Sequence, residues 1–289
     1  MTAMTGASVR EALDSAVDAL AAMGIDEPRF DAELLLGEAM ECERAALVAD
    51  SGAEVPAPAG RRFGEMVRRR LRREPVAYIL GRRGFRNLEL AVDRRVLVPR
   101  PETELLVELA LEMEPSRVLD VGTGSGAIAL AMADELPGCE VVATDTSPEA
   151  LEVARANAER LGLTERVRFL EGTLPEGESF DLILANLPYI AERDWVSLQP
   201  EVTQWEPREA LLAGLDGLDV YRAFLPACGR AFTPNAAITS AALAVEVGEG
   251  QAPAVAELFR GAGFGEIETR PDLAGIERVV IGRAGSEAA

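Results

Sequence analysis

The four residues Asn186-Leu187-Pro188-Tyr189 follow a predicted strand and carry groups that could hold a reacting amide. A primary amide nitrogen is a weak nucleophile that presents two N–H donors. The side-chain oxygen of Asn186 and the backbone carbonyl of Leu187 could each accept one of them and align the nitrogen with an electrophile. The Tyr189 ring could shield such a site from water, although a Pro-Tyr pair can also simply end a strand.

A glycine-rich loop, Gly122-Thr123-Gly124-Ser125-Gly126, lies between another predicted strand and a helix. Glycines allow a tight turn and a close approach to a ligand, and the helix behind them offers free N–H groups. The next strand ends in Asp145, whose carboxylate could accept both hydroxyl hydrogens of a ribose. This placement predicts a nucleoside cofactor. The GxGxG spacing favours S-adenosylmethionine, but the loop alone leaves NAD open.

The composition excludes several kinds of catalytic site. The sequence has no histidine, and all 29 of its basic residues are arginine. Triads with histidine, histidine metal sites, Schiff-base lysines and the lysine of a P-loop are therefore excluded. The cysteines Cys42, Cys139 and Cys228 match no metal or redox spacing, so reduced thiols and no metal are expected.

Charge and hydropathy limit the partners and the compartment. The formal net charge is -20, and such a surface repels phosphates, so no direct binding of nucleic acid is expected. No apolar run approaches the length of a membrane span, and the first residues lack the pattern of a signal peptide. We therefore predict a cytoplasmic protein without a membrane partner.

Strands and helices alternate from residue 116 onward, which is typical of a doubly wound, mainly parallel α/β sheet. The predicted strands are 118–122, 140–145, 167–172, 180–186, 241–248 and two more near the C-terminus, and the helices are 127–136, 148–161 and 252–261. Ligands bind beyond the carboxyl ends of such strands, so the glycine-rich loop and the tetrapeptide are expected to be neighbours.

The first part of the chain is predicted to be helical. Apolar spacing indicates helices at 9–23, 30–40 and 43–49 and a fourth that ends near residue 73. Residues 88–98 alternate and predict a β-hairpin connector, after which Pro101 suits the first turn of a helix. We predict a helical domain over 1–80, a hairpin linker over 81–100 and the α/β domain over 101–289.

The most specific segment is Leu97-Val98-Pro99-Arg100-Pro101-Glu102-Thr103-Glu104. With residues 74–81, the loop 120–126 and the tetrapeptide, it resembles the release-factor glutamine methyltransferases of the HemK or PrmC type. The resemblance covers nearly the whole chain. Other matching positions are Phe85, Glu206-Pro207, Ala210-Leu211, Glu246-Val247-Gly248, Gln251 and 275–279.

The resemblance implies a Rossmann-like methyltransferase domain joined by a hairpin to a helical substrate-recognition bundle. It implies methyl transfer from S-adenosylmethionine, which becomes S-adenosylhomocysteine, to the glutamine of the Gly-Gly-Gln motif of bacterial release factors. Residues 122–126, Asp145 and Asn186 would bind the cofactor. Asn186, Pro188 and Tyr189 would be catalytic, and they would hold the glutamine together with Leu187.

Two positions depart from the family pattern. Leu187 replaces the first proline of Asn-Pro-Pro-Tyr; it keeps the backbone carbonyl and is still restricted by Pro188. The third strand ends in Gly172-Thr173-Leu174, where the family commonly has an acid and an aromatic residue near the adenine. Thr173 could instead hydrogen-bond an adenine edge, and Leu174 could pack on its face.

Four other functions remain open. The first is adenine N6-methylation of RNA or DNA, because Asn-Leu-Pro-Tyr also resembles the ribosomal adenine dimethyltransferases and the exocyclic amine of adenine likewise presents two N–H donors. A ribosomal protein could supply the glutamine. A nucleoside-binding module without catalysis is a third alternative. An NAD-dependent dehydrogenase is disfavoured because no convincing proton donor is present.

A run of arginines stands out in this acidic chain, at Arg61, Arg62, Arg68, Arg69, Arg70, Arg72 and Arg73. It could dock a release factor or the ribosome, or it could be a solvated helix face.

Overall fold

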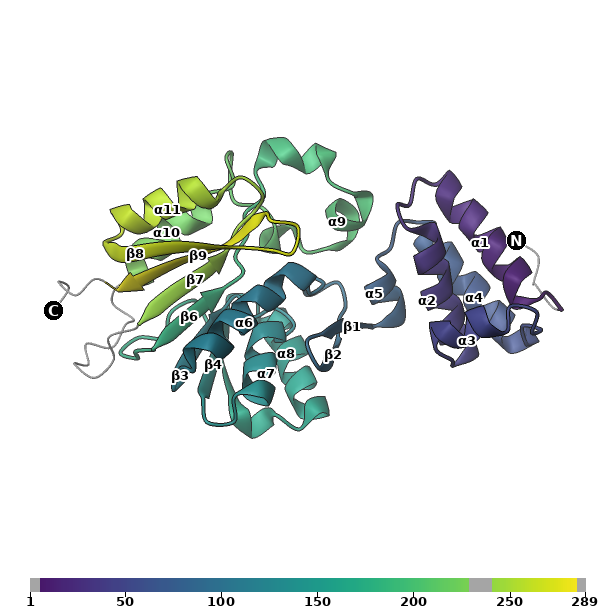
Figure 1. Ribbon diagram of the computed structural model, residues 1–289, viewed down its shortest axis with the longest axis horizontal. Coiled ribbons are helices and arrows are strands. Elements are labelled where there is room, and N and C mark those ends of the chain that lie inside the picture. The colour runs from purple at the N-terminus through teal and green to yellow at the C-terminus, as the bar shows by residue number, and fades with distance from the viewer. Residues whose placement is uncertain (1–5, 229–240, 285–289) are drawn as a thin grey trace. The chain divides into compact units, whose positions relative to one another are not determined.

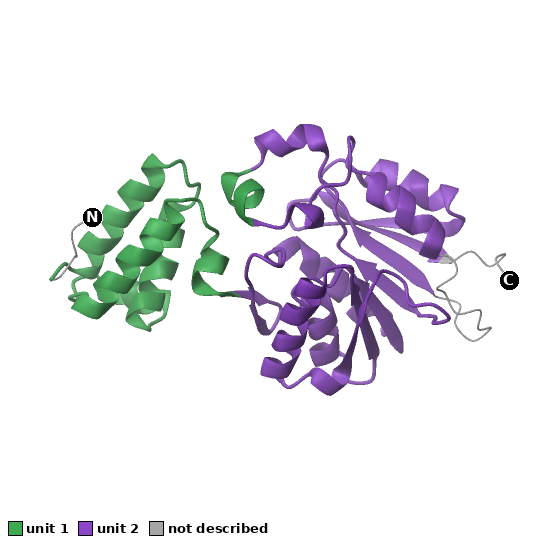
Figure 2. Cartoon of the chain, turned by 180° about the vertical axis from the view of Figure 1, so that it is seen from behind, with its two compact units in different colours: residues 1–82, 199–205 green, residues 83–198, 206–289 purple. Residues whose placement is uncertain are grey.

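A computed structural model of the chain describes residues 6–228 and 241–284. The chain forms two compact units, coloured separately in Figure 2. The first contains the described residues up to Arg82 together with Gln199–Trp205, and the second contains Arg83–Leu198 and the described residues from Glu206 onward. The ends of the predicted domains, at residues 1 and 289, lie outside the described residues. The finer limits, with 81–100 as a linker, stay a prediction.

The first unit is helical (Figure 1). Its helices are α1 (Val9–Ala22), α2 (Pro28–Met40), α3 (Arg44–Ala49), α4 (Ala57–Arg70), α5 (Val76–Leu80) and α9 (Pro200–Trp205). Helix α1 begins at a capping box, in which the Glu11 N–H donates to Ser8 Oγ and the Ser8 N–H donates to the Glu11 carboxylate. The apolar sides of α1, α2 and α4 bury a core around Leu20, Leu35 and Phe63.

Helix α4 ends at Arg70, before the predicted limit near residue 73. Arg73 has a φ of 65°, in the left-handed region, so the helix cannot continue through it. Its guanidinium donates to the carbonyl oxygens of Met23 and Gly24, each at 2.9 Å. These bonds give a physical reason for the early end of the helix.

Four arginines of the run form ion pairs with acids of the same unit: Arg62, Arg69, Arg70 and Arg73. Arg70 Nε donates to Asp31 Oδ2 at 2.6 Å, and Arg70 Nη1 lies 2.6 Å from Glu201 Oε1 in an ion pair that lacks hydrogen-bond geometry. Arg73 Nη2 donates to the other oxygen of Glu201 at 2.6 Å, and Arg69 forms an ion pair with Glu74. Glu201 brings a segment from late in the chain into this helical unit.

A two-stranded hairpin follows the helices, made of β1 (Arg82–Phe85) and β2 (Leu88–Ala91). The hairpin predicted over 88–98 lies earlier, at 82–91, and the alternation predicted beyond Ala91 is wrong. The Asp93 carboxylate accepts the Arg95 N–H at 3.0 Å, and the Asp93 carbonyl accepts the Val96 N–H at 3.1 Å. These bonds form a turn, which ends the alternation.

Seven strands of the described residues form one sheet in the second unit, in the order β5-β4-β3-β6-β7-β9-β8. They are β3 (Arg117–Val121), β4 (Glu140–Asp145), β5 (Val167–Glu171), β6 (Leu182–Ala185), β7 (Ala242–Glu246), β8 (Phe264–Pro271) and β9 (Glu277–Ala284). The pairs from β5 to β7 are parallel, and β9 is antiparallel to both of its neighbours. The doubly wound fold is confirmed, and its strand order reverses between β3 and β6.

Helices cover both faces of this sheet (Figure 1). They are α6 (Glu104–Met113), α7 (Ala127–Glu135), α8 (Pro148–Leu161), α10 (Asp219–Cys228) and α11 (Ala252–Gly261). Short 3-10 turns lie at η1 (Pro101–Thr103), η2 (Thr164–Arg166), η3 (Glu192–Ser197) and η4 (Arg208–Ala210).

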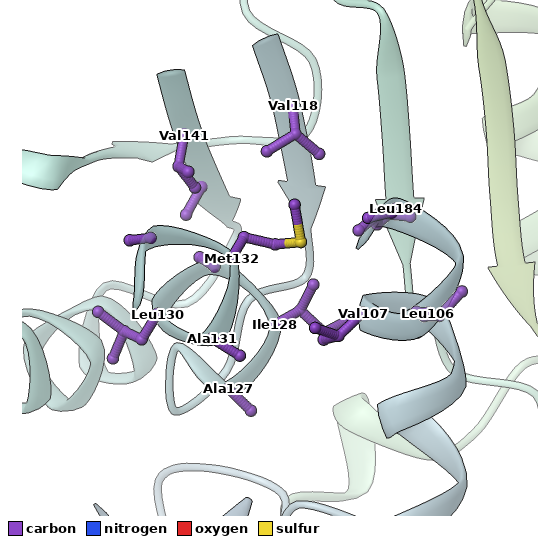
Figure 3. Packing of buried hydrophobic residues seen from close by; sticks show 14 of the residues in the cluster. Leu106, Val107, Val118, Ala127, Ile128, Leu130, Ala131, Met132, Val141 and Leu184 are labelled. Atoms are coloured by element: carbon purple, nitrogen blue, oxygen red, sulfur yellow. The ribbon is translucent and has the colours of Figure 1, made fainter. Parts of the chain in front are cut away.

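Alternate residues of the central strands enter two separate cores. Val118 and Leu184 belong to the core with α6, α7 and α8, whereas Leu119 and Ile183 belong to the core with α10 and α11. This is the period of two expected for a strand that is buried on both faces. Figure 3 shows Met132 of α7 directed toward β3 in the first core. Burial of one such side chain stabilises the fold by about 1.5–3 kcal/mol.

Within the described residues, no helix combines the length and the apolar character needed to cross a membrane.

Candidate active site

The register between β3 and β6 places the glycine-rich loop 122–126 beside the tetrapeptide 186–189. Val121 pairs with Ala185 at the ends of β3 and β6, so the residues that follow, Gly122 and Asn186, leave the sheet side by side. The N–H groups of Gly122 and Thr123 both donate to the carbonyl of Thr144 in β4, at 2.9 Å. The carboxyl ends of β3, β4 and β6 therefore meet where the strand order reverses, as the sequence predicted.

The loop needs its glycines because of their backbone angles. Gly122, Gly124 and Gly126 have φ values of 75°, 56° and 86°. A Cβ at Gly126 would also lie 2.8 Å from Leu130 Cδ1. Beneath the loop, buried Asp120 Oδ2 accepts hydrogen bonds from Thr123 Oγ1 at 2.6 Å and from the Ala129 N–H at 3.1 Å. Burial raises the pKa of Asp120 to about 7, against the opposing effect of these bonds.

The Asp145 carboxylate is oriented by backbone donors. Oδ2 accepts the Gly124 N–H at 2.9 Å and Oδ1 accepts the Ser147 N–H at 2.8 Å. Each oxygen keeps a further lone pair for a ligand. The Ser147 side chain caps α8 by accepting the Ala150 N–H. The end of β4 and the start of α8 thus hold an acceptor group beside the loop.

A cavity of about 570 Å³ opens over these strand ends, within the usual range for a small-molecule site. Eight of the predicted residues line it: Gly122, Gly124, Asp145, Thr173, Leu174, Asn186, Leu187 and Pro188. Four other predicted residues, Thr123, Ser125, Gly126 and Tyr189, are not part of the lining.

The predicted residues outside the lining support those within it. Thr123 and Gly126 hold the loop through the bonds to Asp120 and the packing on Leu130. The Ser125 carbonyl accepts Nδ2 of buried Asn157 at 2.9 Å. The Tyr189 hydroxyl donates to Glu246 Oε1 at a longer distance of 3.5 Å.

Gln251 clamps the backbone of the tetrapeptide. Its Nε2 donates to the Tyr189 carbonyl at 2.8 Å, while its Oε1 accepts the Gly248 N–H at 2.9 Å. Two glycines make room for this contact: a Cβ at Gly217 would overlap the Tyr189 carbonyl oxygen, and a Cβ at Gly248 would lie 2.8 Å from Gln251 Oε1. These contacts explain Gly248 and Gln251 of the segment 246–251.

Two other distant motifs meet as an ion pair. Arg100 Nη2 donates to both carboxylate oxygens of Glu206, at 2.7 and 2.8 Å. Glu206 is buried, and this burial raises its pKa although Arg100 opposes the rise. The next residue, Pro207, lines the cavity. The pair therefore joins the Pro-Arg-Pro segment to one wall of the site.

The side chain of Asn186 is held from behind. Its Nδ2 donates to Thr103 Oγ1 at 2.9 Å, and Thr103 Oγ1 donates to Glu246 Oε2 at 2.6 Å. Thr103 and Glu246 are both buried. The Asn186 side-chain oxygen is therefore the atom left for a ligand in the cavity that this residue lines.

Sequence reasoning about the site missed several residues. Arg95, Val96, Ser147, Glu209, Val220 and Phe224 line the cavity but were not predicted to do so. The supporting roles of Thr103, Glu246 and Asn157 were missed too. Thr103 and Glu246 did stand in segments that resembled the family, which was the only available signal. Helix α10, which supplies Val220 and Phe224, was not predicted.

The lining fits a nucleoside cofactor. Gly122 and Gly124 have no side chains and allow such a group to approach the backbone closely. The oriented carboxylate of Asp145, at the end of β4, suits its ribose, and apolar Leu174 suits its base. No cluster of three or more His, Cys, Asp or Glu side chains suited to a metal occurs among residues 6–228 and 241–284.

Solved structures share this fold. The hMettl16 catalytic domain in complex with MAT2A 3'UTR hairpin 6 matches with a TM-score of 0.55 and 13% identity, over 69% of this chain and 77% of that one. A methyltransferase from Pyrococcus furiosus matches with a TM-score of 0.50 and 18% identity, over 68% and 89%. These matches show a Rossmann-like fold, and its cavity at the strand ends defines a protein that can hold a nucleoside cofactor.

Comparison of sequences gives the family. Residues 11–81 match the PrmC N-terminal domain, and residues 118–205 match a methyltransferase domain. The release factor glutamine methyltransferase of Geobacter sulfurreducens is 42% identical over 96% of this chain and 97% of its own length. That of Deinococcus radiodurans is 42% identical over 95% and 98%. The chain belongs to the family of release factor glutamine methyltransferases.

Proposed function

We propose that this protein methylates the side-chain amide nitrogen of a glutamine, the one in the Gly-Gly-Gln motif of peptide chain release factors. S-adenosylmethionine supplies the methyl group on a sulfonium centre and leaves as S-adenosylhomocysteine. The observation that carries the proposal is the cavity in which Asn186 and Leu187 lie beside Gly122 and Asp145. Membership of the family supports the choice of substrate.

Two neutral oxygens would hold the substrate amide. Because Thr103 accepts the Asn186 Nδ2, the Asn186 Oδ1 is available to accept one N–H of the glutamine. The Leu187 carbonyl would accept the other. Neither acceptor is a strong base, so the nitrogen loses its proton to solvent after the transfer, and alignment supplies most of the rate.

The remaining predicted residues would fix this geometry. Pro188 restricts the backbone of Leu187, and Gln251 holds the Tyr189 carbonyl. Asp145 would accept the ribose hydroxyls, and the backbones of Gly122 and Gly124 would allow close approach of the cofactor. Thr173 and Leu174 would meet the adenine.

The helical unit would recognise the release factor, with the hairpin as its linker. The PrmC N-terminal domain matches these helices, which supports the assignment. Because release factors work on ribosomes, we propose that the protein acts in the cytoplasm. No direct binding of nucleic acid is proposed, given the net charge of -20.

The test combines two variants with a product assay. The wild-type protein, labelled cofactor and a purified release factor are incubated, and the Gly-Gly-Gln peptide is analysed by mass spectrometry. Asn186→Ala should leave cofactor affinity within about twofold but lower turnover by about 100-fold or more. Asp145→Ala should mainly weaken the cofactor Kd, since it loses the ribose acceptor.

A release factor that lacks this glutamine should take no label. Label on another residue, or preferential label on RNA adenine, would contradict the proposed substrate. Unchanged turnover of Asn186→Ala would contradict the assigned role of the amide, and an unaltered Kd for Asp145→Ala would contradict the ribose contact.

A further inference from the structure

A line of hydrogen-bonded side chains lies behind Asn186. Asn186 Nδ2 donates to Thr103 Oγ1 at 2.9 Å, and this hydroxyl donates to Glu246 Oε2 at 2.6 Å. Glu246 is anchored in turn, because the Tyr221 hydroxyl donates to its backbone carbonyl at 2.6 Å. The exposed fractions of Thr103 and Glu246 are 4% and 2%, so solvent does not compete for these bonds.

The direction of the line follows from counting hydrogens. A hydroxyl has one hydrogen to donate, and the hydroxyl of Thr103 gives it to a carboxylate, which can only accept. The oxygen of Thr103 can therefore act only as an acceptor toward Asn186. It selects the amide rotamer in which NH₂ faces Thr103 and Oδ1 faces the opposite way.

The opposite amide rotamer would set two acceptor oxygens against each other in a buried place. The loss of such a buried hydrogen bond corresponds to a preference of roughly 10- to 100-fold for the observed orientation. In the wrong orientation, the NH₂ group of Asn186 would confront the NH₂ group of a substrate amide. The two donors could not bind each other, so the substrate nitrogen would lose one of its two acceptors.

We infer that Thr103 and Glu246 are positioning residues, which set the orientation of the Asn186 amide and so keep its side-chain oxygen turned toward the nitrogen of the methyl acceptor. The inference rests on the proposed function, because it assumes that Asn186 Oδ1 meets the substrate. It also gives a physical role to the threonine of the Pro-Arg-Pro-Glu-Thr segment.

The kinetic test uses two substitutions at one position. Thr103→Val keeps the shape of the side chain but removes the hydroxyl, and Thr103→Ser restores the hydroxyl on a smaller side chain. Turnover with the release factor is measured at pH 8, together with the cofactor Kd and the thermal midpoint. We expect Thr103→Val to lower kcat about 10- to 100-fold with a cofactor Kd within about twofold, and Thr103→Ser to recover most of kcat.

A second readout does not depend on turnover. The sequence holds only four asparagines, Asn87, Asn157, Asn186 and Asn235, and three glutamines, Gln199, Gln204 and Gln251. The side-chain NH₂ signals in a ¹⁵N spectrum are therefore few, and an Asn186→Asp variant assigns the one of interest. In the wild type, this NH₂ group should exchange slowly with water, and in Thr103→Val its exchange should become faster.

The two measurements separate two kinds of failure. If the wild type does not methylate the release factor but the Asn186 NH₂ is protected by Thr103, the proposed function fails and the orientation of the amide stands. If the wild type is active and Thr103→Val keeps both kcat and NH₂ protection, the inference is overturned. It is also overturned if Thr103→Ser is as slow as Thr103→Val, because packing rather than the hydroxyl would then be responsible. Should Thr103→Val fail to fold, Glu246→Leu removes the carboxylate that fixes the direction of the Thr103 hydroxyl, and it is judged by the same readouts.

Discussion

Replacing Arg70 by methionine should destabilise the helical unit strongly. Only 8% of the Arg70 side chain is exposed, and its partners Asp31 and Glu201 are each 12% exposed. The substitution would leave the buried Asp31 carboxylate without its cation, and it would leave Glu201 paired with Arg73 alone. Removal of one partner from a buried ion pair costs about 3–5 kcal/mol, so we expect a loss of that size at pH 8.

The loss of stability in Arg70→Met should become smaller as the pH falls, because of the environment of Asp31. Burial already raises the pKa of Asp31, and Arg70 opposes that rise. Without Arg70 the pKa rises further, so the folded variant takes up a proton as the pH falls and its unpaired charge disappears. The deficit of Arg70→Met should therefore shrink between pH 8 and pH 5.

Tryptophan fluorescence in urea can report this unit alone. The sequence has 2 tryptophans, and Trp205 lies in α9 while Trp195 belongs to the second unit. A Trp195→Phe background leaves only Trp205, whose indole N–H donates to the Arg72 carbonyl at 3.3 Å. Glu41→Gln is a matched control, because it breaks an exposed pair with Arg62 and should cost under about 1 kcal/mol.

The reasoning is refuted if Arg70→Met costs under about 1 kcal/mol, as the control does, or if its deficit is the same at pH 5 and pH 8. Adding Asp31→Asn to Arg70→Met should restore part of the loss, since the amide needs no counter-charge.

Two further predictions concern the site. Gly217→Ala should destabilise the fold by about 2 kcal/mol or more and lower kcat, because Gly217 has a φ of 79° and a Cβ there would overlap the Tyr189 carbonyl. Gly138→Ala is its control, since a Cβ at Gly138 meets nothing within 4 Å; equal stability of the two variants would contradict the clamp. Burial raises the pKa of Glu246 to about 7 from the usual 4.5. The hydrogen bond from Thr103 is the largest opposing effect, Glu102 adds to the rise, and Arg278 and Tyr189 oppose it. The folded wild type therefore loses stability as the pH rises from 4.5 to 7, by roughly 3 kcal/mol at most. Glu246→Gln should lack this loss when the free energy of unfolding in urea is compared at pH 5 and pH 8. Parallel pH profiles of the two proteins would contradict the raised pKa of Glu246.

Much of the second unit could be predicted because its signals are local. The predicted helices 148–161 and 252–261 coincide with α8 and α11, and strand β4 matches 140–145. The glycine-rich loop and the tetrapeptide were placed together because parallel strands share one carboxyl edge. Helix α10 escaped prediction; it contains Pro226, which argues against a helix when only the sequence is read.

The supporting contacts of the site could not be predicted from spacing. Asn186 and Thr103 are 83 positions apart, and Thr103 and Glu246 are 143 positions apart. Nothing in local periodicity links such residues, since only the finished sheet brings them together. The predicted position of the hairpin was wrong for a different reason: the alternation persists to residue 98 in the sequence, but the side-chain bond of Asp93 turns the backbone.

The return of Gln199–Trp205 to the helical unit has a consequence for how such proteins can be recombined. A chimera that takes only the first 82 residues from a relative would replace Asp31 and Arg70 but keep the Glu201 that completes their charge cluster. The N-terminal helices are therefore not a cassette that can be exchanged with one cut. Their sequence must be exchanged together with residues 199–205. A graft that moves both segments should retain the native stability.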